Sequence, residues 1–373
     1  MAVLLVALGL LASSATAKPQ SPAIGHAHAV SGAAGSGPGK RDLTVMTQNL
    51  YLGSSLTPAL TATDAASFVA AVAQIYGTVL YTNFPARAEA IADEVEAQGP
   101  DLIGLQEVTK WTTEGEKAPL GFDFLAILQS DLEARGLDYS VAAVSDNADI
   151  GPAPLALGEC FEPPATINCT VRLQDRDVIL VNDDTPGLTW SNPQSGRYAA
   201  QEVVNSPVGS LSFDRGWASI DARLKQQPFR FVTTHLETEE FPTVQQTQAG
   251  EFLKGPARGG TVIATGDFNS AADGSTTNSY AQVTAPGKFR DAWDEDQLGP
   301  GLSCCQESNT PPLAPGALNN PVSTLRTRID LILTRGAAKS DGAQLIGDSP
   351  FEATPPLWPS DHAGVVAQLR LNG

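Results

Sequence analysis

The pattern of apolar and polar positions predicts a mixture of strands and helices from residue 42 onward. Apolar and polar residues alternate over 43–48, as in a half-buried strand, and the apolar run 101–106 predicts a buried strand. Between them, apolar residues recur at helical spacing after Asp64 and again over 85–98. Further strands are predicted at 139–144, 177–181, 217–222, 229–234, 261–265, 328–333 and 364–371, and further helices at 123–135 and 243–253. Strands and helices mix without a strict βαβ rhythm, so we expect an α/β fold with mixed sheets.

Two segments, 145–176 and 294–325, interrupt this rhythm and are predicted to be long loops, each holding one cysteine pair. Cys160 and Cys169 bracket a short stretch, which favours a local disulfide worth about 3 kcal/mol in the chain-entropy model. Adjacent Cys304 and Cys305 are candidates for a vicinal bridge. Free thiols are the alternative, and zinc is less favoured because no histidine lies near these cysteines in the sequence.

Composition narrows the class of protein. The 373 residues allow one large domain or two small ones, and an apolar fraction of 42% indicates a globular chain. The formal charge of −18 disfavours non-specific nucleic-acid binding through a broad basic surface. A nuclease is still allowed, because a bound metal ion supplies positive charge locally.

The N-terminus has the features of an export signal. Residues 2–12 are apolar and Ser14–Ala17 offers a small-residue cleavage site, so we predict a signal peptide at 1–17, a flexible leader at 18–41 and one domain at 42–373. A lipid anchor or retained helix is the alternative. No other run reaches the roughly 18 apolar residues of a membrane span, so we expect a secreted chain without a transmembrane segment. His26 and His28 in the leader are excluded from the site.

Polar residues that could act in catalysis or metal binding lie at the ends of predicted strands. They are Asn49, Glu107, His235, Asp267, Asn269, Asp330, Asp361 and His362. Taken singly, each has an ordinary structural explanation: Asp-Phe-Asn forms turns, and Ser-Asp-His caps helices or loops. Together they match the needs of phosphodiester hydrolysis, which are a cation, a water, a base and donors that stabilise negative charge.

Each residue type has a plausible task. Glu107 and Asn49 offer oxygens for a hard cation. His362 exchanges protons near neutral pH, and Asp330 can orient its imidazole and favour its charged form. His235 is a donor suited to stabilising charge on phosphorus.

These residues lie in motifs that together resemble the endonuclease/exonuclease/phosphatase superfamily, over about residues 42–371. The motifs are Gln48-Asn49, Leu105-Gln106-Glu107, Thr234-His235-Leu236, Gly266-Asp267-Phe268-Asn269, Arg328-Ile329-Asp330 and Ser360-Asp361-His362. That group includes pancreatic-type deoxyribonucleases, neutral sphingomyelinases and inositol-polyphosphate phosphatases. The resemblance implies a four-layered α/β sandwich, with two mixed sheets face to face and helices outside. It also implies a divalent-metal hydrolase, normally using Mg²⁺, with Mn²⁺ or Ca²⁺ as alternatives.

The resemblance also implies roles for individual residues. Asn49 and Glu107 would hold the metal, with Asp361 near both metal and phosphate. His362 would be the general base or acid, oriented by Asp330. The remaining three would position the nucleophile and phosphate or stabilise the transition state: Asp267, Asn269 and His235.

Arg215 is a candidate phosphate contact. The alternative is a turn arginine paired with Asp214. Both interrupting segments are predicted to lie near the mouth of the site, where they would shape the substrate.

Two functional hypotheses remain from the sequence. The first is an exported Mg²⁺-dependent phosphodiesterase or phosphatase, expected to be a monomer. The two segments offer no basic face and no clustered aromatics for DNA, so small phosphoesters or phospholipid head groups are favoured as substrates. Recognition of inositol phosphates would need clustered Lys and Arg, which the sequence does not show. The second is a catalytically silent member that binds a partner; the full set of polar residues argues against it.

Overall fold

The computed structural model describes residues 42–163, 166–206, 209–295, 299–308 and 316–372. Arg41–Gly373 form one of two units into which the chain divides. The predicted signal peptide and leader, with His26 and His28, lie outside the described residues.

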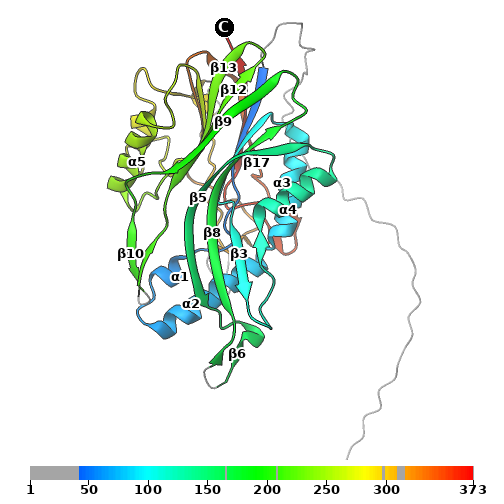
Figure 1. The fold of residues 1–373 in the computed structure, drawn as a ribbon, viewed down its shortest axis with the longest axis vertical. Coiled ribbons are helices and arrows are strands. Elements are labelled where there is room, and N and C mark those ends of the chain that lie inside the picture. Colours follow the sequence, from blue (N-terminus) through cyan, green and yellow to red (C-terminus); the bar gives the residue numbers. More distant parts are fainter. Residues whose placement is uncertain (1–41, 164–165, 207–208, 296–298, 309–315, 373) are drawn as a thin grey trace, which may run out of the picture. The chain divides into compact units, whose positions relative to one another are not determined.

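Two mixed sheets hold most of the strands (Figure 1). The eight-stranded sheet has the order β17 (Ala338–Ile346), β20 (Gly364–Leu371), β1 (Asp42–Asn49), β2 (Leu102–Gln106), β8 (Thr170–Asn182), β3 (Lys110–Glu114) and β4 (Phe122–Asp123), with β5 (Tyr139–Pro154) also paired to β8. The six-stranded sheet has the order β15 (Arg290–Asp291), β16 (Asp330–Arg335), β14 (Val262–Asp267), β13 (Gln227–His235), β12 (Gly216–Leu224) and β9 (Leu188–Arg197).

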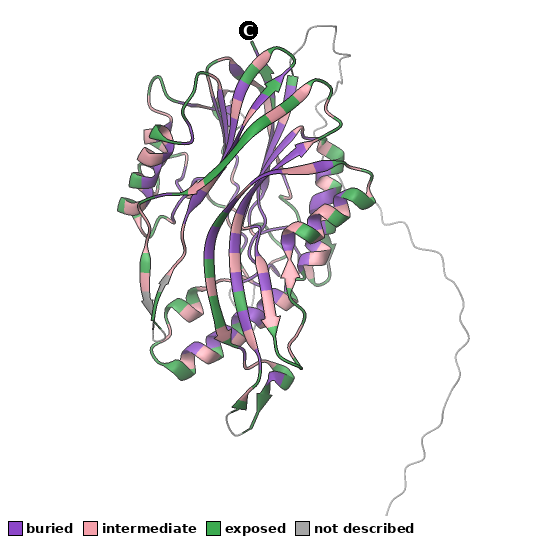
Figure 2. Cartoon of the chain, viewed as in Figure 1, coloured by how far each residue is buried: buried purple, intermediate pink, exposed green. Residues whose placement is uncertain are grey.

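Side-chain alternation makes each sheet apolar on both faces. In β1, Val45 packs in the cluster between the sheets, and the next residue, Met46, packs on the outer face with the helices. In β13, Phe231 and Val232 divide in the same way between the two faces. The predicted sandwich of two mixed sheets between layers of helices is therefore confirmed, and Figure 2 shows the buried residues concentrated along these strands.

Helices cover the outer faces of both sheets. The helices α2 (Ala65–Tyr81), α3 (Phe84–Gln98) and α4 (Phe124–Ala134) pack on the eight-stranded sheet, and α5 (Pro242–Lys254) and α6 (Ser279–Val283) pack on the six-stranded sheet. As predicted, α2 begins after Asp64, which forms a capping box with Ser67, and α3 ends at Gly99 in a left-handed conformation. Short helices elsewhere are α1 (Thr57–Leu60), α7 (Ala292–Glu295) and the 3₁₀ turn η1 (Gly158–Cys160).

No single helix in the described part of the chain is long and apolar enough to cross a membrane, although α2 and α3 together have the length and composition of a span bent by 45°. Both helices bury their apolar faces against the eight-stranded sheet.

The prediction of a long loop at 145–176 is wrong. Strand β5 continues to Pro154 and β8 begins at Thr170, so most of this segment forms a paired arm of the sheet. The strand pairing shifts register three times along β5, between Val141 and Ala143, Asp146 and Asp149, and Ile150 and Ala153. Each shift resets the two-residue alternation, which explains why the sequence pattern concealed the strand.

The tip of this arm holds the first cysteine pair. Beyond β5, the chain forms η1, β6 (Phe161–Glu162) and β7 (Thr166–Ile167). Cys160 and Cys169 are joined by a disulfide, which confirms the predicted local bridge.

The second predicted loop, 294–325, is irregular where the structure describes it after α7, at 299–308 and 316–325. Cys304 and Cys305 are bonded to each other, as the vicinal prediction has it. Cys304 also forms isolated β-bridges with Thr327 and His362, which fix this segment beside the C-terminal histidine motif.

Several strands were missed in the sequence because their residues are mainly polar or exposed. These are β3, β9, β10 (Val203–Ser206), β11 (Gly209–Ser212), β17 and β18 (Glu352–Ala353). β18 pairs with β19 (Pro356–Leu357), which is only two residues long.

Candidate active site

Strand register places three of the predicted residues in one row across the six-stranded sheet. β13 and β14 are parallel, so their C-terminal residues His235 and Asp267 face each other. β16 runs antiparallel to β14, and its first residue, Asp330, faces Asp267 from the other side. In the eight-stranded sheet, β1 and β2 are also parallel and end together at Asn49 and Gln106, next to Glu107.

The two rows meet across the gap between the sheets. Asn49 Nδ2 lies 3.2 Å from Glu107 Oε1 and 3.3 Å from Asp267 Oδ2. Strand ends from both sheets therefore converge on one polar centre, and the structure brings together all eight predicted strand-end residues.

His362 and Asp330 form a buried pair at this centre. His362 Nδ1 lies 2.8 Å from Asp330 Oδ2, and the Asp330 side chain has no exposed surface. The other ring nitrogen, Nε2, lies 3.9 Å from Asp267 Oδ2 and 3.9 Å from Asp361 Oδ1. This leaves Nε2 facing the centre while Asp330 fixes the orientation of the ring.

Electrostatics strengthen this pair. Burial alone would lower the pKa of His362, but the carboxylates of Asp330 and Asp361 outweigh burial and hold it well above its usual value. Burial, together with the charges of Asp330 and Glu107, raises the pKa of Asp267 to about 7. Burial and Glu107 raise the pKa of Asp361 to about 7 as well. Carboxylates that lie this close together repel one another when ionised, which disfavours their ionisation. A bound cation would reduce this repulsion.

The oxygens at the end of β1 and β2 suit a hard divalent cation. Glu107 has a positive φ of 53°, and its Oε2 accepts a 2.7 Å hydrogen bond from the Leu52 amide. Asn49 Oδ1 accepts from the Tyr51 amide at 2.8 Å. These bonds hold the Glu107 carboxylate and the Asn49 side-chain amide beside the centre, where Asn49 Nδ2 faces Asp267 Oδ2. Among the described residues, the buried Asp330 Oδ1 has no hydrogen-bond partner. The candidate metal ligands are oxygen atoms, which Mg²⁺, Mn²⁺ and Ca²⁺ prefer, so these residues fit such an ion.

The surroundings of His235 favour its uncharged form. It is 1% exposed, and burial, followed by the charges of Arg215 and His362, lowers its pKa well below the usual value. Its Nε2 lies 3.1 Å from Asn269 Nδ2. The backbone N–H of Asn269 donates a hydrogen bond to Asp267 Oδ1 at 2.8 Å and so holds Asn269 in place.

Arg215 lies in the site rather than in a turn pair with Asp214. Asp214 is paired with Arg197 at 2.8 Å, so the alternative of an Arg215–Asp214 pair is wrong. Instead, Arg215 NH1 lies 3.1 Å from His235 Nε2, and NH2 lies 3.3 Å from Glu237 Oε1. Its buried Nε has no partner in the described residues, which leaves a donor for a ligand.

Sequence reasoning missed the residues that support this centre. Arg87 is fully buried in α3 and donates to the carbonyls of Leu50, Tyr51 and Pro359, so it ties the segment after β1 to the segment that precedes His362. Its only sequence signal is a charge on the apolar face of a helix.

A buried acid pair in β8 was missed as well. Asp175 and Asp177 are within a strand, and burial raises the pKa of both, that of Asp175 to about 7. Asn147 Nδ2 donates to Asp175 Oδ2 at 3.3 Å. The available signal was that the two acids continue the alternate positions that the apolar Val171 and Leu173 occupy earlier in the strand.

A pocket of about 400 Å³ opens beside the centre. It is lined by Glu107, Asn269 and Arg215, and both interrupting segments contribute to it, through Ile150 and through Cys304 and Cys305. The predicted position of these segments at the mouth of the site is thus confirmed. The sequence argument against zinc is overturned in one respect: His362, although distant in sequence, has its Nε2 3.9 Å from Cys305 Sγ.

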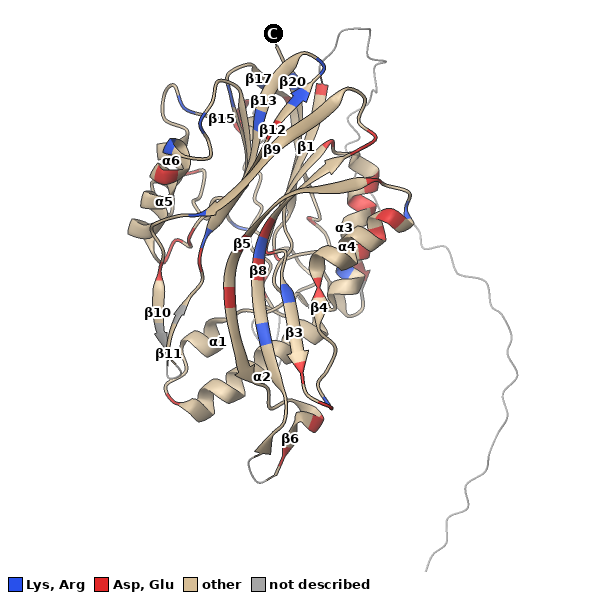
Figure 3. Cartoon of the chain, in the orientation of Figure 1, with Lys and Arg blue, Asp and Glu red and all other residues tan. Residues whose placement is uncertain are grey.

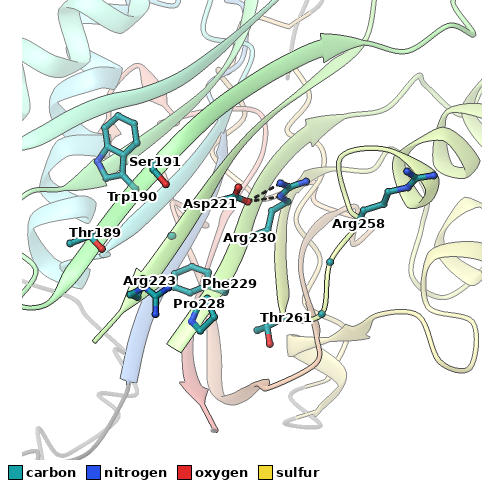
Figure 4. Close-up of a pocket in the computed structure, with 13 residues that line it drawn as sticks. Thr189, Trp190, Ser191, Asp221, Arg223, Pro228, Phe229, Arg230, Arg258 and Thr261 are labelled. Carbon is teal, nitrogen blue, oxygen red and sulfur yellow. Dashed lines mark hydrogen bonds and ion pairs between the residues drawn. The ribbon is translucent and has the colours of Figure 1, made fainter. Parts of the chain in front are cut away.

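A larger hollow of about 820 Å³ lies at the opposite end of β13, near Pro228 and Phe229 rather than His235 (Figure 4). Trp190, Arg223 and Arg258 line it, and none of the predicted site residues does. The chemistry therefore belongs to the smaller pocket.

Comparison with known proteins agrees with this architecture. A sequence model of the Endonuclease/Exonuclease/phosphatase family matches residues 46–362. The chain belongs to this family. Family members are divalent-metal-dependent hydrolases that act on phosphoester bonds. No curated protein matches the chain in sequence.

Solved structures share the fold at low identity. A family protein from Leptotrichia buccalis has a TM-score of 0.54 and 14% identity, covering 88% of this chain and 99% of its own. A family protein from Bacteroides thetaiotaomicron has a TM-score of 0.51 and 17% identity, covering 89% and 95%. Humanized D. rerio TDP2 has a TM-score of 0.50 and 15% identity, covering 88% and 99%. At these identities the likeness concerns the fold alone.

Proposed function

We propose that this protein is an exported, Mg²⁺-dependent phosphodiesterase that acts on small or lipid phosphoesters. The observation that carries the proposal is the 2.8 Å contact between His362 Nδ1 and Asp330 Oδ2, with Nε2 facing the oxygen cluster at the strand ends. An oriented imidazole beside a set of hard oxygen ligands has the parts that phosphoester hydrolysis requires.

Asn49, Glu107 and Asp361 would hold the metal. When bound, the ion would polarise a phosphoryl oxygen and favour ionisation of a nearby water. Mn²⁺ or Ca²⁺ would be accepted by the same oxygens, because both prefer carboxylate and amide ligands.

The side chains of this protein would perform the remaining tasks. His362 Nε2 accepts a proton from the attacking water or returns one to the leaving group, and Asp330 stabilises the imidazolium that forms. Asp267 and Asn269 orient the water and a phosphate oxygen from their shared turn. Neutral His235 and cationic Arg215 stabilise the charge that develops on the phosphate.

The pocket beside these residues supports a small or lipid substrate. Leu52, Leu56 and Phe213 line one part of it, with Leu60, which is 38% exposed. Besides Glu107, four glutamates line it: Glu202, Glu237, Glu239 and Glu240. They outnumber the two arginines of the lining, Arg215 and Arg326, although Glu237 is paired with Arg215. An apolar wall would accept an acyl chain or an aryl group, whereas acidic side chains would repel the neighbouring phosphates of a polynucleotide.

The overall charge supports the same choice. The formal net charge is −18, and Figure 3 shows lysine and arginine dispersed among acidic residues in this view. Extracellular DNA is the alternative substrate, reached through the metal rather than through a basic surface. A catalytically silent binding role is less well supported, because every predicted polar residue is present and converges on one point.

Export is part of the proposal. It rests on the apolar segment at 2–12 with its cleavage site, and the Cys160–Cys169 disulfide fits an oxidising compartment. The chain would then divide into a signal peptide at 1–17, a leader at 18–41 and a monomeric catalytic domain at 42–373.

A substrate panel tests the proposal. The purified protein would be given sphingomyelin vesicles, a bis-aryl phosphate and plasmid DNA, each with Mg²⁺ and each with excess EDTA. We expect EDTA-sensitive hydrolysis of the lipid or the aryl ester to exceed DNA cleavage. Faster cleavage of DNA would replace the substrate assignment, and no EDTA-sensitive hydrolysis of any substrate would favour the silent role.

A further inference from the structure

The vicinal cysteine pair lies against the histidine that the proposed mechanism uses. The ligand atoms of Cys304, Cys305 and His362 all lie within 4.8 Å of one another, and Cys305 Sγ is 3.9 Å from His362 Nε2. The β-bridges of Cys304 to Thr327 and His362 hold the backbone of this segment in place. The sulfurs therefore face the reactive nitrogen from a fixed position.

We propose that Cys304, Cys305 and His362 form a site for a soft metal ion such as Zn²⁺, which is latent while the disulfide is closed. Two thiolates and one imidazole are a typical ligand set for zinc. The other ring nitrogen of His362 already contacts the Asp330 carboxylate at 2.8 Å, an arrangement that leaves Nε2 as the ligand and increases its basicity. Asp361 Oδ1, 3.9 Å from Nε2, offers a fourth ligand.

The closed disulfide keeps this site from forming, because neither sulfur is then a thiolate. Reduction by a dithiol opens it. The dithiol gives two electrons and two protons to the Cys304–Cys305 bond, which breaks into two thiols, and the reductant closes its own disulfide. The metal ion then displaces the two thiol protons and binds both sulfurs with His362 Nε2.

A soft ion bound there would inhibit the enzyme. It would occupy the nitrogen that exchanges protons with water or leaving group, and this half of the inference rests on the proposed function. The disulfide would thereby protect the catalytic histidine from zinc, and a reducing environment would remove that protection. The hard-metal site at Asn49, Glu107 and Asp361 uses oxygen ligands alone. Asp361 belongs to both sites, and the two sulfurs give the second site its preference for a soft ion.

Cobalt titration tests the binding half without any activity measurement. The full-length protein would be treated with dithiothreitol, desalted without oxygen and titrated with Co²⁺, while the charge-transfer absorption from thiolate to cobalt is recorded. The matched variants are Cys304→Ser/Cys305→Ser, which removes the proposed ligands, and Cys160→Ala/Cys169→Ala, which removes the other disulfide.

We expect a thiolate-to-cobalt band in the reduced wild type and in Cys160→Ala/Cys169→Ala; Co²⁺ held by the oxygen ligands alone gives no such band. The oxidised wild type and Cys304→Ser/Cys305→Ser should give no band. A missing band in the reduced wild type, or a band that persists in Cys304→Ser/Cys305→Ser, would overturn the site.

Zinc sensitivity tests the inhibitory half. With Mg²⁺ in excess, Zn²⁺ equimolar with the protein should reduce turnover at least tenfold in the reduced wild type and have little effect on the oxidised protein. The rate of each variant with zinc is compared with its own rate without zinc. In Cys304→Ser/Cys305→Ser, inhibition by zinc should no longer depend on whether the protein has been reduced. A cobalt band without zinc inhibition would refute the inhibitory role alone, and a protein without turnover would refute the proposed function while the spectrum still reports on the site.

Discussion

The contact between Asp330 and His362 can be tested by one substitution that changes little in shape. Asp330→Asn replaces the carboxylate oxygen 2.8 Å from His362 Nδ1 with an amide group. The amide cannot stabilise an imidazolium, and its N–H₂ favours the tautomer in which Nδ1 accepts and Nε2 carries the proton. His362 would then be unable to accept a proton through the nitrogen that faces the site.

The expected loss follows from burial of the pair. Neither side chain is more than 7% exposed, and breaking a buried ion pair costs about 3–5 kcal/mol. Above the pKa of His362 the resting imidazole is neutral and the imidazolium forms during the reaction, so on that plateau the loss corresponds to roughly two to four powers of ten in turnover. The Michaelis constant should change little, because the lost interaction develops during the reaction.

The pH dependence should change in a defined direction. Burial lowers the pKa of His362 and Asp330 is the main group that raises it, so removal of the carboxylate should lower that pKa. The limb of the kcat/KM profile that reports deprotonation of His362 should therefore move to lower pH, while the plateau falls.

The assay is hydrolysis of a bis-aryl phosphate from pH 5 to 9 at saturating Mg²⁺. Asp221→Asn is the matched control: this aspartate binds Arg230 at 2.8 Å in β12, away from the site, and the variant should turn over like the wild type. The double variant His362→Ala/Asp330→Asn should lose no more than His362→Ala alone, because the two residues act as a unit. If Asp330→Asn kept more than a tenth of wild-type turnover with an unchanged profile, the role given to Asp330 would be wrong.

Three other predictions concern the cation, the stability of the metal-free protein and the phosphate. Glu107→Gln should raise the Mg²⁺ concentration for half-maximal activity at least tenfold, because a neutral oxygen replaces an anionic ligand; an unchanged Mg²⁺ titration would remove Glu107 from the metal site. Asp267→Asn should stabilise the metal-free protein at pH 8. Folding raises the pKa of Asp267 from 3.8 to about 7, so above pH 7 the ionised carboxylate destabilises the folded state by at most about 4 kcal/mol. This destabilisation disappears as the pH falls towards 3.8. Urea unfolding in EDTA at pH 8 and pH 4 measures this difference, and equal midpoints at pH 8 would contradict it. Arg215→Lys keeps the charge but loses the planar fork, so kcat/KM should fall about tenfold or more, whereas an unaffected value would exclude a phosphate contact.

The ends of the central strands could be predicted because their signals are local. Apolar runs ending at Asn49, Glu107, His235 and Asp267 mark both the strands and the chemistry beside them. The helix that begins after Asp64 carries its own capping residue. Such features need only a few neighbouring residues, so the sequence pattern contains them.

Other features depend on residues that are distant in the chain. The pairing of β5 with β8 was hidden by its register shifts, which reset the alternation. Arg215 could not be assigned to Glu237 rather than Asp214, because backbone geometry decides which acid its side chain meets. The approach of Cys305 to His362 joins positions 57 residues apart and leaves no trace in the local pattern.

The central claim is that His362 and a divalent cation together hydrolyse a phosphodiester. The most direct measurement is the rate of bis-aryl phosphate hydrolysis by the wild type and by His362→Ala over a titration of Mg²⁺ into protein first treated with EDTA. The account predicts that wild-type activity rises from zero with Mg²⁺ and that His362→Ala remains at least about a thousandfold slower at every concentration. Equal rates for the two proteins, or wild-type hydrolysis that persists without any divalent ion, would contradict it.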